Sequence, residues 1–373
     1  MFPKYCSPYN SKNNFSCFSN ESLLVIAQKY NELYSDKIAI PDTLTNKNRK
    51  RFWDVLSSKV NQKTNCNDEV CWLNSDLFRN IDSSIPNETF RPKKPIEWNQ
   101  NATTWLSTTD INNVLEQYMK KYPDFHYIGA VPIDFDKELV LGLCVVDELC
   151  KLNLRKLYLD GIRKLGIVFN LDAHDQPGSH WVSMFVDMNN GGIYYFDSYA
   201  KPPGTEVQDL MERIRVMGNK MIKDGIIDIN QFSDEHAVET SYKKIDNKKA
   251  VIPNNVDIQL DTPSFLKTNK KIQKKDLFYV INDEMLGGAD KKIIELSKSL
   301  PKTNKRIIQK GFRKFYNNIR FQYKGSECGV YSIHFQTELL KGKTFFDVIK
   351  NIIDDDTINK QRNFYYSPNN SLN

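Results

Sequence analysis

The chain has 373 residues, of which 40% are hydrophobic and 12% aromatic, and its formal net charge is +6 at pH 7. This length and apolar content can build a sizeable core in one or two domains, which excludes an intrinsically disordered chain. Neither end carries an apolar run long enough to span a membrane, and the first residues lack the apolar stretch of a signal peptide, so we expect a cytoplasmic protein without membrane association.

Residues 1–97 are expected to form a separate helical extension. Apolar residues recur at helical spacing over 20–34, with Ser19 or Asn20 as the cap, and again over 52–60. Pro92-Lys-Lys-Pro95 is typical of a linker and ends this part of the chain.

The seven cysteines lie at positions 6, 17, 66, 71, 144, 150 and 328 and form no regular framework. An odd, sparse set in a chain without a secretion signal predicts reduced thiols. Four residues separate Cys66 from Cys71, but no second Cys or His pair follows at zinc-ligand spacing, so we expect neither a metal site nor a cofactor.

Residues 98–345 are expected to form the main domain, in which predicted helices and strands alternate irregularly. A helix capped by Thr109 or Asp110 opens it and ends near Pro123. The segments that follow are a strand or loop at 125–135, a buried apolar segment at 139–146, a buried strand at 165–171, a hairpin of strands at 179–186 and 192–197, and a helix from 202.

The family resemblance given below implies an insertion at about 224–311, because the 125 positions from residue 197 to residue 322 are many more than that family usually has between them. Within it and just beyond, residues 267–314 contain fourteen Lys or Arg against five Asp or Glu, a balance of +9. Such a segment can bind nucleic acid or an acidic partner, although a solvated lysine-rich surface is the commoner reason for it. We expect residues 346–373 to form a C-terminal tail that is frayed from Arg362 onward.

Cys328 lies where an aromatic, β-rich stretch at 314–322 gives way to a helical pattern. At a helix N-terminus, exposed backbone N–H groups favour the thiolate over the thiol, so Cys328 is a candidate nucleophile. Gln322 can return across the Gly325-Ser326 turn and form an oxyanion hole with the backbone N–H of Cys328. A single cysteine in a helix is more often a small core residue, so this interpretation depends on its partners.

His180 is the best candidate for the base that a thiolate enzyme needs. It opens the first strand of the predicted hairpin, and if Asp187 pairs with Gly192, the numbers of paired residues sum to 379. Asp197 then lies diagonally across from His180 on the same face, roughly 7–8 Å away, where a carboxylate can orient an imidazole. The nearest alternative base, His174, lies in a polar loop with no carboxylate placed across a strand pair, so we expect it to face solvent or substrate.

These motifs together resemble the superfamily of cysteine peptidases that contains the ubiquitin-like (SUMO) proteases and the adenovirus proteinase. The resemblance is carried by Gly178-Ser-His180-Trp181, by Phe196-Asp197-Ser198, by Gln322 and by Glu327-Cys328-Gly329, and it covers about residues 98–345. It implies an α+β, papain-like fold with a central sheet flanked by helices. It also implies that Trp181 forms a wall of the substrate channel.

The resemblance implies a cysteine endopeptidase in which Cys328 attacks, His180 transfers protons, Asp197 orients His180 and Gln322 binds the oxyanion. The N-terminal extension, the insertion and the Asn- and Lys-rich composition resemble polyprotein-processing proteases of large cytoplasmic DNA viruses. We therefore expect cleavage of a viral structural polyprotein after Gly-Gly-like or Gly-small sequences, in the host cytoplasm and the virion. Leu286-Gly-Gly-Ala289 is a candidate self-cleavage site.

Two alternatives stay open at this stage. One is an isopeptidase that removes SUMO or another ubiquitin-like modifier from its conjugates. The other is a catalytically inactive scaffold that binds nucleic acid through residues 267–314.

Overall fold

The computed structural model describes residues 5–10, 15–79, 81–139, 142–228 and 311–368, residues 230 and 232, and short strands at 239–240, 278–280 and 307–308. The chain forms two compact units, one of Met1–Pro123 with Asp356–Asn373 and one of Asp124–Asp355. The domain boundaries predicted near residues 97 and 345 do not coincide with the limits of these two compact units. As limits of functional domains, the predicted boundaries stay a prediction.

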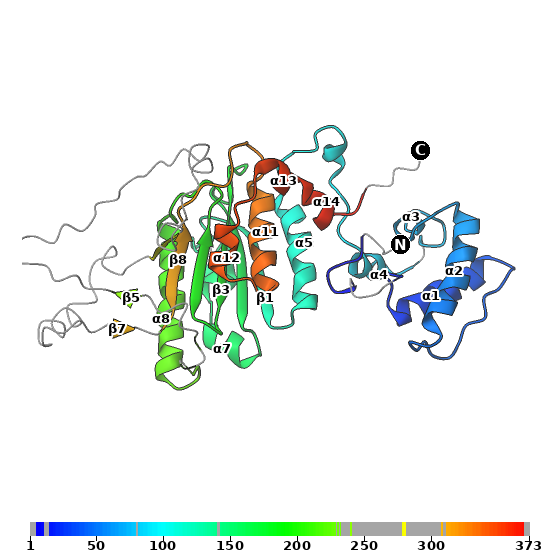
Figure 1. Ribbon diagram of the computed structural model, residues 1–373, viewed down its shortest axis with the longest axis horizontal. Coiled ribbons are helices and arrows are strands. Elements are labelled where there is room, and N and C mark those ends of the chain that lie inside the picture. The colour runs from blue at the N-terminus through cyan, green and yellow to red at the C-terminus, as the bar shows by residue number, and fades with distance from the viewer. Residues whose placement is uncertain are drawn as a thin grey trace, which may run out of the picture. The chain divides into compact units, whose positions relative to one another are not determined.

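The first unit is helical up to residue 123 (Figure 1). Its elements are α1 (Asn20–Leu33), α2 (Arg49–Thr64), α3 (Glu69–Trp72), α4 (Ser84–Thr89), the 3-10 helix η2 (Ile96–Asn99) and α5 (Thr108–Lys121). The predicted cap of α1 is confirmed, because the Ser19 side chain accepts a hydrogen bond from the Ser22 amide. The cap predicted for α5 was wrong: Ser107 caps it, and Asp110 is the third helical residue of the same capping box.

The C-terminal segment is ordered through residue 367, so the expectation of a frayed end from Arg362 was wrong over that range. It forms α13 (Asp355–Lys360) and α14 (Arg362–Tyr365). Tyr366 is buried and its hydroxyl donates to the Asp110 carbonyl at 3.0 Å, while Ser367 forms a β-bridge with Lys93. The buried Tyr366 side chain anchors a tail whose polar composition alone predicts disorder.

The prediction of reduced thiols was also wrong. Six cysteines form three disulfides, Cys6–Cys17, Cys66–Cys71 and Cys144–Cys150, and Cys328 is the one free cysteine among the seven. All three bonds join cysteines that are close in sequence, at separations of 11, 5 and 6 residues. The odd count therefore leaves a single thiol, and it is the candidate nucleophile.

A mixed sheet forms the centre of the second unit. Its strands are β1 (Phe125–Pro132), β2 (Lys164–Asn170), β3 (Trp181–Asp187), β4 (Gly192–Phe196), β6 (Phe278–Val280) and β8 (Arg313–Asn317), and over the described residues they lie in the order β1-β2-β3-β4-β8-β6. β1 pairs with β2 and β4 with β8 in parallel, and the remaining pairs are antiparallel. A separate pair joins β5 (Glu239–Thr240) to β7 (Ile307–Ile308).

The chain between β1 and β2 differs from its prediction. Residues 139–146 were expected to be a buried apolar segment, but Leu139 and Leu143 are 42% and 52% exposed. This stretch leads into α6 (Asp147–Cys150) and α7 (Leu154–Leu159), and the Cys144–Cys150 disulfide holds its end. A short apolar run cannot be assigned to a strand by periodicity alone.

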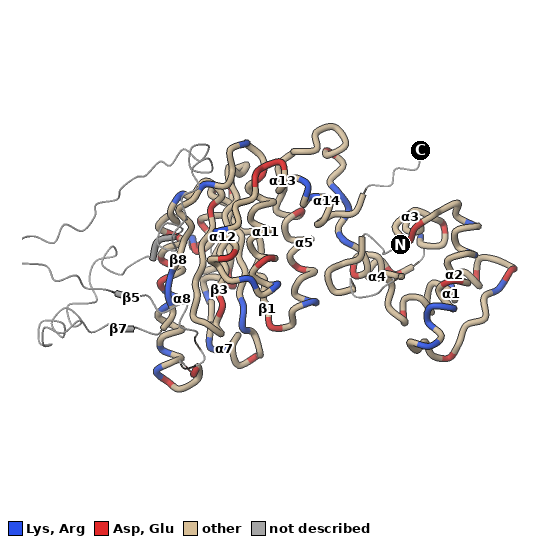
Figure 2. The backbone as a smooth tube through the Cα atoms, viewed as in Figure 1, with Lys and Arg blue, Asp and Glu red and all other residues tan. Residues whose placement is uncertain are grey.

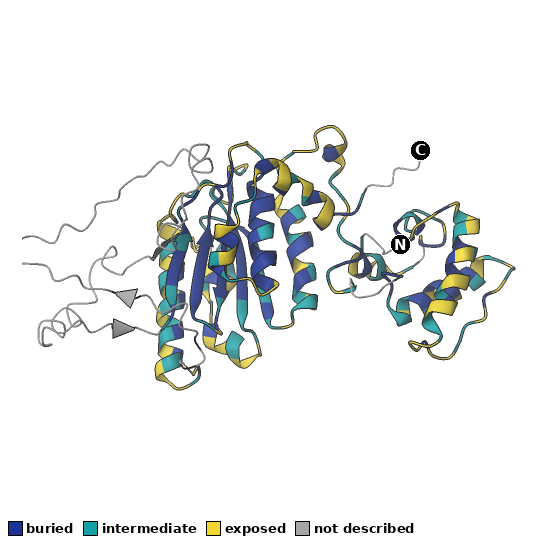
Figure 3. Ribbon diagram, in the orientation of Figure 1, coloured by how far each residue is buried: buried dark blue, intermediate teal, exposed yellow. Residues whose placement is uncertain are grey.

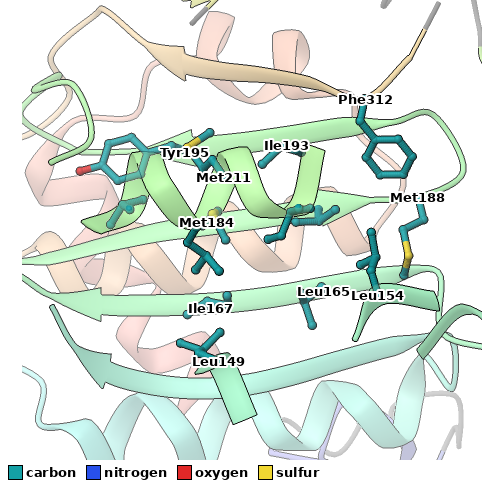
Figure 4. Packing of buried hydrophobic residues seen from close by; sticks show 14 of the residues in the cluster. Leu149, Leu154, Leu165, Ile167, Met184, Met188, Ile193, Tyr195, Met211 and Phe312 are labelled. Carbon is teal, nitrogen blue, oxygen red and sulfur yellow. The ribbon is translucent and has the colours of Figure 1, made fainter. Parts of the chain in front are cut away.

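Helices cover both faces of the sheet, which confirms the predicted α+β architecture (Figure 1). Alternate strand residues such as Leu165, Ile167 and Met184 form one core cluster with α8 (Thr205–Lys223), as Figure 4 shows. The intervening residues face α11 (Cys328–Leu340) and α12 (Phe345–Lys350), where Phe196 stacks on Phe335 with ring centroids 5.0 Å apart.

α11 is buried along almost its whole length (Figure 3). Its apolar residues accordingly occur all around the helix rather than along one amphipathic stripe. Its first residue is Cys328, so the helix that is most enclosed by the fold also carries the candidate nucleophile at its N-terminus.

Most of the expected insertion at 224–311 lies outside the described residues, and so does the Gly-Gly pair at 287–288. Within the basic segment 267–314, only β6, β7 and residues 311–314 are described. Where the chain is described, Lys and Arg are interspersed with Asp and Glu in both units (Figure 2). No helix in the described ranges combines the length and hydropathy that crossing a bilayer requires.

Candidate active site

The β3–β4 hairpin brings His180 and Asp197 together. Asp187 pairs with Gly192, so the register predicted from the sequence is confirmed. His180 comes directly before β3 and Asp197 directly after β4, at the same end of the hairpin. His180 Nε2 lies 2.7 Å from Asp197 Oδ1, and the two residues are 7% and 0% exposed.

Cys328 meets this pair from the start of α11. Its side chain interacts with the His180 ring, whose pKa it helps to raise, and the residue is 1% exposed. Since Nε2 of the imidazole is bound to Asp197, Nδ1 is the ring nitrogen left for the sulfur. The sulfur, the imidazole and the carboxylate thus follow one another in series, the arrangement that activates a nucleophile.

The imidazole is held in its charged form by its two neighbours. Burial by itself lowers the pKa of His180, but hydrogen bonds to Asp197 and Cys328 and the negative charges of both outweigh burial and raise the pKa from 6.5 to about 9. The ring is therefore protonated at neutral pH, which makes it a proton donor.

Backbone and amide contacts fix the orientation of Asp197. Its Oδ1 also accepts from the Tyr199 amide at 2.8 Å, and its own amide donates to Asn317 Oδ1 at 2.9 Å. The Asn317 side chain returns a bond to the Asp197 carbonyl at 2.7 Å. Asn317 ends β8, so the parallel β4–β8 pairing supports the carboxylate from the strand beside it.

Gln322 is fully buried and its amide is oriented by two hydrogen bonds. Ser198 Oγ donates to Gln322 Oε1 at 2.7 Å, and Gln322 Nε2 donates to the Lys324 carbonyl at 2.8 Å. An amide nitrogen carries two protons, so one N–H stays available for a ligand. The carboxylate of Asp355 accepts the Tyr323 and Lys324 amides, both at 2.8 Å, and holds the loop that leads to Cys328.

Tyr199 is a site residue that the sequence reasoning missed. Its ring stacks on His180 with centroids 4.6 Å apart and planes 23° apart. The same register that located Asp197 contains the signal, because 180 and 199 also sum to 379 and place the two rings opposite each other.

The remaining candidates behave differently. Trp181 starts β3 and is only 4% exposed, and its role as a channel wall stays a prediction. His174 was expected to have no carboxylate partner, but its Nδ1 lies 2.7 Å from Asp134 Oδ2. The residue is exposed, as expected. Burial lowers the pKa of His334 on α11 to about 4, so that ring is neutral at pH 7.

Known proteases are similar to this chain in sequence. Residues 164–247 match the model of the Ulp1 protease family, C-terminal catalytic domain. The putative thiol protease R355 of Acanthamoeba polyphaga mimivirus is 29% identical over 376 residues, which cover 97% of this chain and 92% of that protein. A cysteine protease of African swine fever virus is 27% identical over 46% of this chain and 66% of its own length.

This chain is a cysteine protease that resembles the Ulp1 family. Its fold is also that of a solved viral protease: the crystal structure of an African swine fever virus protease superposes with a TM-score of 0.53 over 98% of this chain and 96% of that one, at 17% identity. The predicted fold class and the predicted enzyme class are thereby confirmed.

Proposed function

We propose that the protease uses Cys328 as nucleophile, His180 as proton donor and acceptor, Asp197 as the group that orients His180, and Gln322 as an oxyanion donor. The observation that carries this assignment is the position of His180, whose ring hydrogen-bonds Asp197 and interacts with the Cys328 side chain. Gln322 adds a buried amide whose second N–H is not used by the described part of the fold.

The chemistry follows from these positions. The Cys328 thiolate attacks the scissile carbonyl carbon, and the resulting oxyanion accepts hydrogen bonds from Gln322 Nε2 and the Cys328 amide. The His180 imidazolium gives its proton to the leaving amine, which leaves a thioester on Cys328. Water then attacks the thioester while His180 takes its proton, and cleavage of the C–S bond restores the thiolate and releases the carboxylic acid.

The proposed substrate is a viral structural polyprotein that is cut after Gly-Gly-like or Gly-small sequences, in the host cytoplasm and the virion. The two viral relatives, both described as proteases, support a viral role. Glycine at the penultimate positions suits a narrow channel beside Trp181, because it has no Cβ. The matching family model, of the Ulp1 proteases, favours the alternative substrate, an isopeptide-linked ubiquitin-like modifier.

The decisive experiment treats the purified full-length protein with a glycine-terminated vinyl sulfone peptide and locates the adduct by mass spectrometry. We expect one adduct, at Cys328, and none in Cys328→Ala or after prior alkylation. His180→Ala should fold and lose cleavage to the same extent as Cys328→Ala, since the two groups act as a unit. Near-normal cleavage by Cys328→Ala would refute the assignment.

A matched pair of substrates separates the two substrate classes. A linear Gly-Gly peptide and an isopeptide conjugate of a ubiquitin-like modifier are offered at equal concentration. A higher kcat/KM for the linear peptide supports polyprotein processing, and the reverse supports deconjugation.

Nucleic-acid binding through residues 267–314 is proposed as an additional activity on the strength of their +9 balance. Binding to DNA should weaken steeply as salt rises, because phosphate contacts release counterions. Deleting 267–310 should abolish that binding and spare peptide cleavage, whereas salt-insensitive or absent binding would mean that the lysines are merely solvated.

A further inference from the structure

Arg320 lies beside the candidate active site and is held there by two tyrosine rings. Its guanidinium carbon is 5.0 Å from the ring centroid of Tyr199 and 4.8 Å from that of Tyr323. Its Nε–H donates to the Gln322 carbonyl at 2.6 Å. These contacts fix a long side chain that would otherwise sample many rotamers, so little conformational entropy is left to lose when it binds a ligand.

Tyr199 connects this arginine to the reacting groups. The ring of Tyr199 contacts Arg320 and also stacks on His180, whose centroid is 4.6 Å away. The two separations, 5.0 and 4.6 Å, place the guanidinium carbon no more than 9.6 Å from the centre of the imidazole. An extended peptide advances about 3.3 Å per residue, so this is a span of about three residues.

The guanidinium has binding capacity that the protein does not use. A guanidinium carries five N–H donors in a planar fork. Apart from Nε–H, none of them makes a hydrogen bond or an ion pair with any residue that the structure describes, and Arg320 is exposed. An exposed arginine is commonly just solvated, but solvation does not require a clamp of two aromatic rings.

We propose that Arg320, clamped by Tyr199 and Tyr323, forms a substrate subsite that binds an acidic side chain within about three residues of the scissile bond. This inference rests on the proposed function, since it takes Cys328 and His180 as the reacting groups. The fork geometry of a guanidinium matches a carboxylate in a bidentate way, which gives preference for Asp or Glu over the amides of the same shape.

The test measures kcat/KM of the full-length enzyme on Gly-Gly peptides that differ at one position at a time, within three residues of the cut but outside the two glycines. Each position carries Asp and Asn in one matched pair and Glu and Gln in another. At one position we expect the acid to be preferred over its amide by roughly 3- to 10-fold, the size expected for a well-oriented exposed ion pair.

Three variants of the enzyme make the result specific. Arg320→Gln should reduce the acid-to-amide ratio to about one, and because the ratio compares two peptides on the same enzyme, it is read independently of any change in the overall rate. Arg320→Glu should reverse the preference, so that a Lys peptide is cleaved faster than its Gln counterpart. Lys201→Gln is the matched control. It removes an exposed positive charge two residues after Tyr199, and among the described residues no tyrosine ring holds Lys201 as Tyr199 holds Arg320. This variant should leave the acid-to-amide ratio unchanged.

The outcomes separate this inference from the function on which it rests. Cleavage with no acid preference at any position, or a preference that survives in Arg320→Gln, overturns the subsite and leaves the protease assignment standing. Failure to cleave any peptide, together with no probe adduct at Cys328, overturns both.

Discussion

His180 Nε2 and Asp197 Oδ1 lie 2.7 Å apart although the two residues are 17 positions apart in the sequence, and both groups are buried. The β3–β4 hairpin accounts for this proximity, since each residue continues one strand past the same end. The bond selects which imidazole nitrogen is left for Cys328 and supplies the negative charge that keeps the ring protonated. The pH behaviour of the enzyme should therefore depend on this one contact.

Replacement of Asp197 should shift the alkaline limb of the pH profile. The pKa of His180 is raised from 6.5 to about 9, so kcat/KM of the native enzyme should fall as the pH rises through about 9. In Asp197→Asn the charge is lost while burial still lowers the pKa, so the fall should begin at least about one pH unit earlier. NMR titration of His180 labelled at Cε1 checks the pKa directly.

Asp134→Asn is the control for that experiment, because it alters the other His–Asp pair, at His174. It should change neither the His180 titration nor the pH profile. An unchanged profile in Asp197→Asn would contradict the role of the carboxylate.

The same titration has a consequence for stability. A raised pKa means that the charged His180 ring stabilises the folded state fully below pH 6.5, and that this contribution is lost as the pH rises through about 9. The full difference corresponds to about 3 kcal/mol. The free energy of unfolding of His180→Ala should therefore depend less on pH between 6.5 and 9 than that of the native protein, as measured by urea titration.

Gln322→Ala should lower kcat by roughly 10²- to 10³-fold and leave KM nearly unchanged, because an oxyanion donor acts mainly in the transition state. Ser198→Ala removes the hydroxyl that donates to Gln322 Oε1, so it should give a smaller loss in kcat of the same kind. Steady-state kinetics on one Gly-Gly peptide compares the two. A kcat unaffected by Gln322→Ala would remove this residue from the site.

Thiol counting tests the disulfides. In the native, non-reduced protein, iodoacetamide under denaturing conditions should modify one cysteine, Cys328, and after reduction all seven. Cys328→Ala should give no modification before reduction. Modification of several cysteines without a reductant would favour the reduced thiols that the sequence analysis expected.

Glycine is required at position 166 in β2 because neighbouring side chains leave no space for a Cβ, and not because the backbone must be flexible there. A Cβ at this position would lie 2.6 Å from Gln336 Oε1 and 2.7 Å from the Phe125 ring. Gln336 cannot withdraw easily, because its Nε2 donates to Ser183 Oγ and to the Met184 carbonyl, both at 2.8 Å. Gly166→Ala should therefore destabilise the protein by about 1–3 kcal/mol in urea unfolding.

Gly204→Ala serves as the comparison, since an added Cβ there meets only Glu206 Oε2, at an ordinary 3.5 Å. Its effect on the free energy of unfolding should stay within about 0.5 kcal/mol. Equal effects of the two substitutions would show that α11 does not press on β2 at Gly166.

The local pattern of the sequence was sufficient for β2 and the β3–β4 hairpin, for the register of that hairpin and for the choice of Cys328, His180, Asp197 and Gln322 as candidates. These features depend on short-range rules: side chains alternate along a strand, a turn sets the pairing, and a helix begins where the apolar period changes. His180 and Asp197 lie in one hairpin, so their proximity could be calculated from residue numbers alone.

Contacts between distant segments were decided only by the tertiary structure. Ser198 hydrogen-bonds Gln322, which is 124 positions away in the sequence, and Asn317 hydrogen-bonds Asp197, which is 120 positions away. Both contacts form because β8 pairs with β4, although the two strands are far apart in the sequence. The docking of Tyr366 on Asp110 likewise depends on which surfaces meet in the fold. Neither spacing nor composition encodes such meetings, since they result from packing of the whole chain rather than from any local preference.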